Sequence, residues 1–175
     1  MGSGKSTVGR LLAKQLGWRF VDLDERIETQ AGLRITEIFD RLGEPAFRGL
    51  ERAELARALG ESAASAVPAV LALGGGTFAQ PENVEMLRAA FLRPAAPRSG
   101  CVIWLDCPFE MLLSRCVTMD DRPLFQDEAS FRKLYDERLP FYRQADLRVE
   151  GGHDPRKVVE RILTSEIFGT QKINA

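Results

Sequence analysis

Gly2-Ser3-Gly4-Lys5-Ser6-Thr7 opens the chain and carries the strongest fold signal in the sequence. Its glycines favour a tight turn with exposed backbone N–H groups, and an apolar pattern with helical spacing follows at once. A glycine-rich turn in front of a helix N-terminus is typical of a loop that binds phosphate. In such a loop Lys5 reaches the β- and γ-phosphates of a nucleotide, and the Ser6 hydroxyl ligates Mg²⁺. We therefore expect the whole stretch to bind ATP.

The front of this loop is incomplete. The full pattern G-x-x-x-x-G-K-[ST] needs a glycine five residues before Gly4, and a strand normally leads into it. Both would precede Met1, so we expect a mis-assigned start or a truncation of roughly ten residues. Loss of that strand would leave its two neighbours in the sheet with unpaired edges.

Composition narrows the class of protein. The chain has 175 residues, with 24 Lys and Arg against 25 Asp and Glu and a formal net charge of −1. This length predicts a single domain, and the charge balance argues against bulk attraction to nucleic acid or to an anionic membrane. The three cysteines form no CxxC pair, and the longest apolar run, 66–73, is far shorter than a membrane span. We therefore expect a cytoplasmic protein without disulfides.

Strand and helix patterns alternate along the chain, which predicts an α/β fold with helices layered around a mostly parallel sheet. The apolar runs at 67–73 and 101–106 predict strands that are buried on both faces. Two further strands are expected at 18–23 and 146–149. Helices are expected at 6–17, 81–91, 109–116, 131–142 and 155–167, together with a helical insertion that has pieces at 33–42 and from Pro45 onward. The segment 93–100 is expected to be a surface loop, to which we assign no function.

Asp22 and Asp24 follow the first expected strand. In an open α/β sheet, the strand end beside a phosphate loop is where ligands bind. Both carboxylates lie on one side of the sheet if the strand stays regular, or bracket the site if the chain turns. The alternative is a helix N-cap with a solvated neighbour.

Further blocks follow in a fixed order: VDLDERIE at 21–28, PAFRGLE at 45–51, LGGGTF at 73–78, DRPLF at 121–125 and ERLPFYRQADLRV at 137–149. With GSGKST at 2–7, they resemble the shikimate kinases in order and spacing over nearly the whole chain. The resemblance implies a three-layer P-loop kinase fold like that of nucleoside monophosphate kinases, with a five-stranded, mostly parallel sheet whose first strand is missing here. It also implies ATP-dependent phosphorylation of the 3-hydroxyl of shikimate, a step of chorismate and aromatic amino acid biosynthesis, with ATP and Mg²⁺.

The resemblance assigns roles on the acceptor side. Asp22 would order Mg²⁺ through water, and Asp24 would be the candidate base for the reacting hydroxyl. Shikimate binding is assigned to Asp24, Arg48, Gly74, Gly75, Gly76 and Arg138, because the two guanidinium groups suit a planar carboxylate and the glycines let backbone N–H groups approach the ring. Glu51 lies three residues after Arg48, so it either orients Arg48 or forms a plain surface ion pair.

On the nucleotide side, the resemblance implies that Arg115 stacks on adenine and that the loop at Pro155 contacts it. Arg122 would be a lid arginine that meets the γ-phosphate when the lid closes. His153, the single histidine, is expected to be an exposed loop residue without a role in phosphotransfer. One histidine and three scattered cysteines give no zinc pattern, so Mg²⁺ brought by the substrate is the one metal expected.

These assignments divide the single domain into three parts. The core is expected at 1–23, 62–114 and 129–175, the acceptor-binding segment at about 24–61, and the lid at about 115–128. A monomer is the expectation that the resemblance implies.

Two alternatives stay open at this point. Another small-molecule kinase of the same fold, such as gluconate kinase, would share the phosphate loop, although the paired arginines and the triple glycine favour a small cyclic carboxylate. A non-catalytic, ligand-binding regulatory module of shikimate kinase type would fit the incomplete start. Against the module, Lys5, Asp22, Asp24 and Arg122 are all retained.

Overall fold

The computed structural model describes residues 2–91, 100–117, 127–152 and 154–169. Most of the loop expected at 93–100, most of the lid expected at 115–128 and His153 lie outside the described residues.

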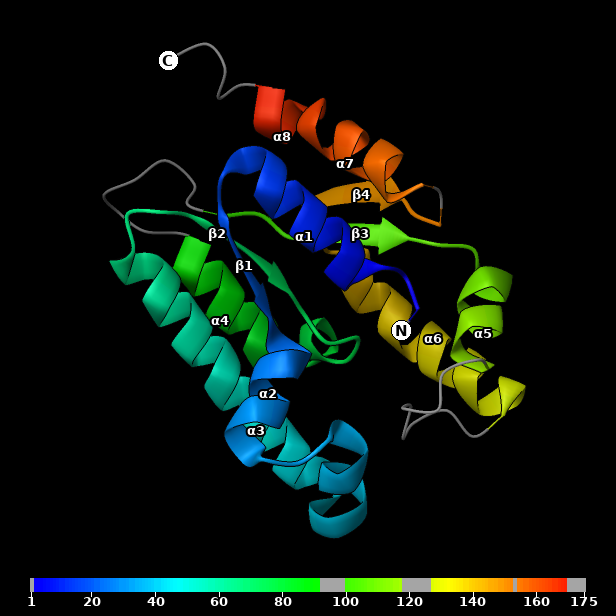
Figure 1. The fold of residues 1–175 in the computed structure, drawn as a ribbon. Helices are drawn as coiled ribbons and strands as arrows, with labels where there is room; N and C mark the ends of the chain where they lie inside the picture. Colours follow the sequence, from blue (N-terminus) through cyan, green and yellow to red (C-terminus); the bar gives the residue numbers. More distant parts are fainter. Residues whose placement is uncertain (1, 92–99, 118–126, 153, 170–175) are drawn as a thin grey trace.

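Helices and strands alternate along the described chain, as the sequence predicts (Figure 1). The helices are α1 (Lys5–Leu16), α2 (Leu23–Ala31), α3 (Ile35–Ala64), α4 (Pro81–Phe91), α5 (Phe109–Val117), α6 (Glu128–Tyr142), α7 (Pro155–Leu163) and α8 (Glu166–Gly169), with a short 3₁₀ helix η1 (Thr77–Ala79). The strands are β1 (Arg19–Asp22), β2 (Ala69–Ala72), β3 (Ile103–Asp106) and β4 (Leu147–Glu150).

The strands form two parallel pairs. β1 pairs with β2, with Phe20 opposite Val70, and β3 pairs with β4, with Leu105 opposite Val149. The parallel direction confirms the prediction. The expectation that β2 and β3 are fully buried is wrong, because all of their residues except Ala72 are only partly buried. Within the described residues each strand has a single strand neighbour, which leaves its other edge more accessible.

Helix α1 joins the two strand pairs. Val8 and Leu12 share a buried cluster with Val149 of β4 and with the apolar face of α7. Val70 of β2 and Ile103 of β3 pack against the same cluster. α1 and α7 therefore cover one face of both strand pairs, as Figure 1 shows.

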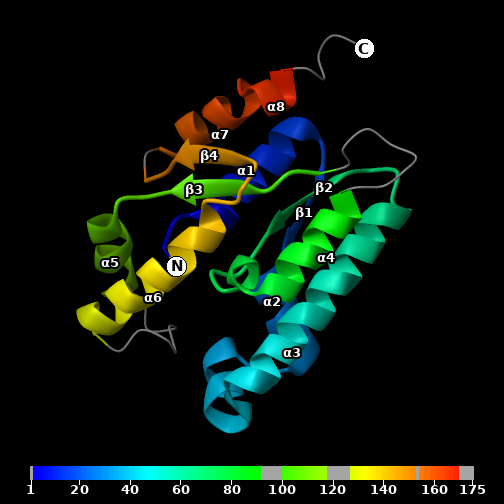
Figure 2. The ribbon, with the colours of Figure 1, turned by 180° about the vertical axis from the view of Figure 1, so that it is seen from behind.

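The opposite face is covered by α3, α4 and α6, which lie in front of the strands when the molecule is seen from behind (Figure 2). The larger core cluster lies here and contains Leu23, Ile27, Leu55, Phe78 and Leu87. A smaller cluster joins α5 to α6 through Phe109, Leu112 and Phe131. The chain is thus layered as helix, sheet and helix, in agreement with the expected fold class.

Side-chain caps move several boundaries away from the prediction. Leu23 is the first residue of α2 and not the last of a strand, because the Asp22 carboxylate accepts the backbone N–H of Asp24 and starts the helix. α6 begins at Glu128, three residues before the expected start, because Asp127 accepts from the backbone N–H of Ser130. The helix expected at 155–167 ends at Leu163, and a separate α8 follows.

The expected limit of the acceptor-binding segment, between 61 and 62, falls inside α3, which continues to Ala64. The two predicted helical pieces in this region are confirmed. They are separated by Gly43, whose φ of 81° and ψ of 167° interrupt the helix. The kink brings the rings of Phe39 and Phe47 to a centroid distance of 4.7 Å.

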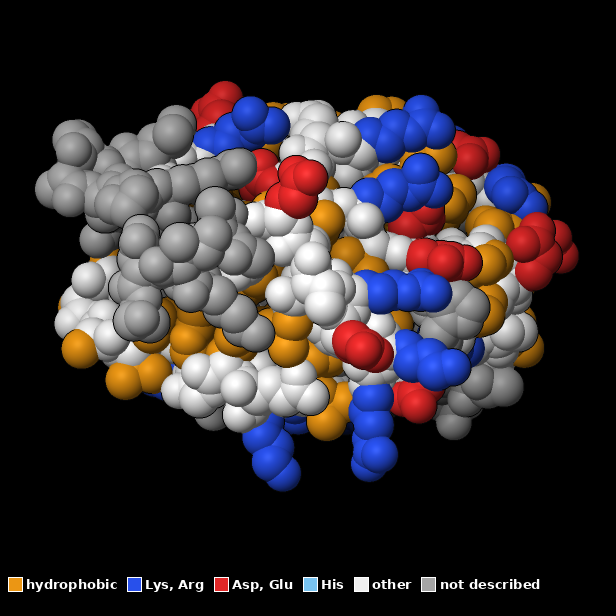
Figure 3. Space-filling view, turned by 90° about the horizontal axis from the view of Figure 1, so that it is seen from above, with side chains coloured by type: hydrophobic (Ala, Val, Ile, Leu, Met, Phe, Trp, Pro, Cys, Tyr) orange, Lys and Arg blue, Asp and Glu red, His pale blue; other side chains and the backbone are white. Residues whose placement is uncertain are grey.

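The described surface mixes charges of both signs. In the view from above, Lys and Arg side chains lie beside Asp and Glu side chains over much of the face outside the grey region (Figure 3). Among the described residues, no helix combines the length and apolar character needed to cross a membrane.

Candidate active site

The N-terminus of α1 is built to receive an anion. Asp side chains cap α2, α6 and α7, whereas the cap of α1 is Gly4, which has no side chain and adopts a left-handed φ of 82°. No acidic residue lies in the first turn of α1. No side chain caps this end of the helix, and the helix dipole favours a negative ligand there.

The glycine-rich turn in front of α1 is held from the side of α5. A guanidinium nitrogen of Arg115 donates to the Gly2 carbonyl at 2.8 Å, and the Cys107 thiol lies 3.8 Å from the Ser3 carbonyl. Burial raises the pKa of Cys107, which keeps the thiol protonated as a donor. A side chain at Gly2 would lie 3.3 Å from the Arg115 Cβ, so glycine lets the loop approach α5 closely. The sequence did not indicate this contact of Arg115 with the loop.

Asp22 links the phosphate loop to the acceptor side. One oxygen of its carboxylate accepts the Ser6 hydroxyl at 2.6 Å, and the other accepts the backbone N–H of Asp24 at 3.1 Å. Asp22 therefore caps α2 and also faces Ser6, while its neighbour Asp24 is only partly exposed and not fully solvated. The chain turns after β1, and Asp24 enters the first turn of α2, where negative charge is favourable.

Arg48 is held in place by carboxylates of its own helix. Its guanidinium donates to Glu51 at 2.9 Å and to Glu44 at 3.1 and 2.8 Å. Glu51 is 1% exposed, so the Arg48–Glu51 pair is not the plain surface ion pair that the spacing also allowed. Burial alone would lower the pKa of Arg48, but the neighbouring carboxylates of Glu51 and Glu44 outweigh it and raise the pKa.

The triple glycine follows β2 and gives space to side chains from other elements. A Cβ at Gly74 would lie 2.7 Å from an Asp24 carboxylate oxygen, and a Cβ at Gly76 would lie 2.6 Å from an Arg48 guanidinium nitrogen. The carbonyl of Gly75 accepts the Tyr142 hydroxyl. Here glycine allows close packing against charged side chains, and the backbone conformation of this turn does not itself call for glycine.

Arg138 approaches from α6 and is 7% exposed. Tyr142 lies one turn further along this helix, and burial raises its pKa, so its hydroxyl stays protonated as a donor to Gly75. α6 thus contributes both a buried cation and an anchor for the glycine turn.

Ser6, the two aspartates, the two arginines and the triple glycine surround one cleft of about 270 Å³. Of the residues expected from the sequence, it is lined by Ser6, Asp22, Asp24, Arg48, Gly74, Gly75, Gly76 and Arg138. Further lining residues that the sequence analysis did not single out are Glu25, Glu28, Arg34, Ile35, Thr36, Phe39, Phe47 and Glu51 as a wall residue. Most of them lie between 25 and 47. That range is inside the expected acceptor-binding segment, so the sequence could have indicated them as candidates.

Of the expected nucleotide residues that the structure describes, Ser6 alone lines this cleft, and Pro155 begins α7. The others are Gly2, Ser3, Gly4, Lys5, Thr7, Arg115 and Pro155. Arg122 lies outside the described residues.

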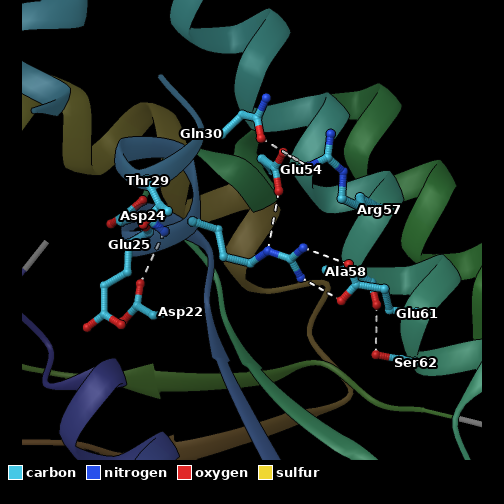
Figure 4. A network of polar contacts seen from close by, with 11 residues as sticks. Asp22, Asp24, Glu25, Thr29, Gln30, Glu54, Arg57, Ala58, Glu61 and Ser62 are labelled. Atoms are coloured by element: carbon cyan, nitrogen blue, oxygen red, sulfur yellow. Dashed lines mark hydrogen bonds and ion pairs between the residues drawn. The ribbon is translucent and has the colours of Figure 1, made fainter. Parts of the chain in front are cut away.

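A second polar network joins α2 to α3 behind the cleft (Figure 4). Arg26 donates to both oxygens of Glu61 at 2.8 and 2.7 Å and lies 3.3 Å from buried Glu54. Arg57 lies 3.1 Å from the same Glu54. Each of these arginines has a carboxylate partner, so the network holds two helices together.

The fold is that of the α/β P-loop kinases, with a glycine-rich loop at a helix N-terminus beside a cleft lined by arginines and carboxylates. The family model described as shikimate kinase matches residues 1–166. The chain belongs to the shikimate kinase family.

Individual relatives agree. A shikimate kinase of Persephonella marina is 41% identical over 165 residues, which cover 93% of this chain and 92% of the relative. The crystal structure of shikimate kinase from Aquifex aeolicus matches with a TM-score of 0.80 at 33% identity, covering 100% of this chain and 95% of that one. Shikimate kinase from Acinetobacter baumannii in complex with shikimate matches with a TM-score of 0.81 at 35% identity, covering 99% and 91%. The gluconate kinase and regulatory-module alternatives are not favoured by these relatives.

Proposed function

We propose that this chain transfers the γ-phosphoryl group of ATP to the 3-hydroxyl of shikimate, giving ADP and shikimate 3-phosphate. One observation carries the proposal: Ser6, at the end of the phosphate loop, lines the same cleft as Arg48 and Arg138. A phosphoryl donor and a small carboxylate acceptor can therefore meet in one space.

The loop supplies the nucleotide side of the reaction. The N–H groups of Gly2, Ser3 and Gly4 and of the first turn of α1 would bind phosphate oxygens, with Lys5 on the β- and γ-phosphates and Thr7 in the same turn. Arg115 and Pro155 would contact adenine, and Arg122 would bring positive charge to the γ-phosphate from the lid.

Ser6 and Asp22 fit Mg²⁺, because a hydroxyl and a carboxylate are hard oxygen donors, and they already lie 2.6 Å apart. When bound, Mg²⁺ would neutralise charge on the β- and γ-phosphates. Ser6 would be a direct ligand, and Asp22 would hold a water of the metal.

On the acceptor side, Arg48 and Arg138 would bind the carboxylate of shikimate, and the backbone of Gly74, Gly75 and Gly76 would approach the ring. Asp24 would accept the proton of the 3-hydroxyl as the new oxygen–phosphorus bond forms and the bond to the bridging oxygen of ADP breaks. An ordinary carboxylate is sufficient, because phosphoryl transfer depends mainly on positioning and charge neutralisation.

The setting of the enzyme is part of the proposal. We expect a cytoplasmic monomer that acts on a small molecule and binds neither nucleic acid nor membrane, with the core at 1–23, 62–114 and 129–175, the acceptor segment at 24–61 and the lid at 115–128. The mixed charges of Figure 3 support the absence of a nucleic-acid surface on the face shown.

Coupled ADP release with shikimate or with gluconate tests this proposal. Turnover is expected with shikimate, and Lys5→Met should lower kcat by roughly 10³-fold because a cation on the transferred phosphoryl group is lost. Lys14→Met is the matched control, since Lys14 is an exposed residue in the last turn of the same helix, and it should keep wild-type turnover.

Other outcomes would point elsewhere. Turnover with gluconate alone would indicate another small-molecule kinase. Shikimate binding by calorimetry without any ADP release would indicate a binding module, and near-normal turnover of Lys5→Met would overturn the role of Lys5.

A further inference from the structure

Thr77 lies at the start of η1 and contacts two residues that line the cleft, Gly74 and Glu51. Its backbone N–H donates to the Gly74 carbonyl at 3.1 Å, so Thr77 closes the turn made by the three glycines. Its hydroxyl lies against the turn, 2.9 Å from where a Cβ on Gly74 would be, and reaches Glu51 of α3. Thr77 is 0% exposed and is not a lining residue of the cleft, so a ligand there is not expected to touch it.

The Thr77 hydroxyl donates to one oxygen of Glu51 at 2.6 Å. The other oxygen of Glu51 accepts from Arg48 at 2.9 Å. Both oxygens of this buried carboxylate are thereby satisfied, and each one has a fixed partner. The orientation of the carboxylate is set by a hydroxyl on the far side, and Glu51 shares the positioning of Arg48 with Glu44.

Thr77 is itself held from α4. The side-chain amide of Asn83, which is 1% exposed, donates to the Thr77 carbonyl at 3.1 Å. A continuous path therefore runs from Asn83 through Thr77 and Glu51 to Arg48. The guanidinium at its end packs where a Cβ on Gly76 would lie, so the path also returns to the glycine turn.

We infer that Thr77 is a positioning residue for acceptor binding, which fixes Glu51 and through it Arg48, with Asn83 as its support. The inference rests on the proposed shikimate kinase activity and adds a determinant of acceptor affinity outside the cleft. Without the hydroxyl, one oxygen of Glu51 loses its partner in a buried place, and the carboxylate is free to rotate. Arg48 then leaves the geometry that a bidentate contact with a carboxylate needs.

The test compares Thr77→Val, which keeps the shape of the side chain, with Thr77→Ser, which keeps the hydroxyl. Steady-state kinetics with each substrate are measured together with thermal melts. We expect Thr77→Val to raise the KM for shikimate about 10-fold and to change the KM for ATP less than about 2-fold. In Thr77→Ser the KM for shikimate should return to near the wild-type value. Thr164→Val removes a hydroxyl that bonds to the Glu160 carbonyl in α7, and it should change neither KM.

Thr77→Ala removes the same hydroxyl without a branched carbon, so it serves if Thr77→Val does not fold, and it should show the same rise in KM. Equal rises in both KM values, or an unchanged KM for shikimate in a folded Thr77→Val or Thr77→Ala, would overturn the inference while leaving the proposed function intact. A wild-type protein that does not turn over shikimate would overturn both.

Discussion

Glu51 and Glu54 lie one turn apart on α3, and both are buried, at 1% and 2% exposure, yet they serve different regions of the molecule. Glu51 belongs to the cleft, where its partners are Arg48 of the same helix and the Thr77 hydroxyl. Glu54 belongs to the contact between α2 and α3, where its partners are Arg26 and Arg57. Each carboxylate pairs with one arginine of α3 and with one group of another element, so the difference lies in what those partners face.

The two sites also use their arginines differently. Around Glu54, Arg26 of α2 contacts two carboxylates of α3, Glu54 and Glu61, and so connects the two helices (Figure 4). Around Glu51, Arg48 is held by its own helix while it lines an open cleft. The arginine that Glu51 holds lines the cleft and can meet a ligand, whereas Arg26, which Glu54 holds, comes from α2 and fastens that helix to α3.

Arg48→Ala should produce the largest separation between the two regions. We expect kcat/KM for shikimate to fall by about 10²- to 10³-fold, because a charge-assisted contact with the acceptor carboxylate is lost, while the KM for ATP stays near wild type. The measurement is initial-rate kinetics with each substrate varied in turn. Arg26→Ala is the matched control and should lower the Tm without changing either KM. A fall in ATP affinity for Arg48→Ala would show that the assignment of Arg48 to the acceptor subsite is wrong.

Glu54→Gln should show the reverse pattern. The change leaves Arg26 and Arg57 without their shared buried carboxylate, and both arginines are partly exposed, so we expect a loss of about 1–3 kcal/mol in the free energy of unfolding. That corresponds to a fall in Tm of roughly 3–10 °C for a chain of this length. Denaturant unfolding and kinetics at a permissive temperature check this, and a raised KM for shikimate with an unchanged Tm would abolish the contrast with Glu51.

Glu61→Gln should have the smallest effect. Glu61 lies at the exposed edge of the α2–α3 network, and the hydrogen bond from Arg26 lowers its pKa below the usual 4.5. A lowered pKa in the folded state stabilises the protein above the ordinary pKa, and this contribution is lost as the pH falls. The Tm difference between wild type and Glu61→Gln should therefore be small at about pH 7 and smaller still at about pH 4; a difference that grows on acidification would contradict the assigned pairing.

The comparison also explains what the sequence could predict. Alternating patterns were enough for the α/β class and all four described strands, and the family motifs led to Asp22, Arg48 and the glycines. Spacing along the helix suggested the Arg48–Glu51 pair, but not its burial, because the decisive partner Thr77 is 26 residues away. The pairing of Arg26 with Glu54 could not be predicted either, because the two residues lie on different helices and meet only when α2 packs against α3.

Helix starts were misjudged for a related reason. Asp22 and Asp127 start α2 and α6 through side-chain bonds to backbone N–H groups, and the apolar pattern does not record these bonds. Partial burial of β2 and β3 depends on which strands lie beside them, which is a property of the assembled sheet.

The close approach of Arg48 to Gly76 limits which mutations position 76 can tolerate. Every residue other than glycine carries a Cβ, and that atom would lie 2.6 Å from the guanidinium. Any missense change in codon 76 must therefore displace the end of the Arg48 side chain, whatever the chemistry of the new residue. Wherever growth depends on the enzyme, such changes should be selected against through the displaced guanidinium more than through the fold.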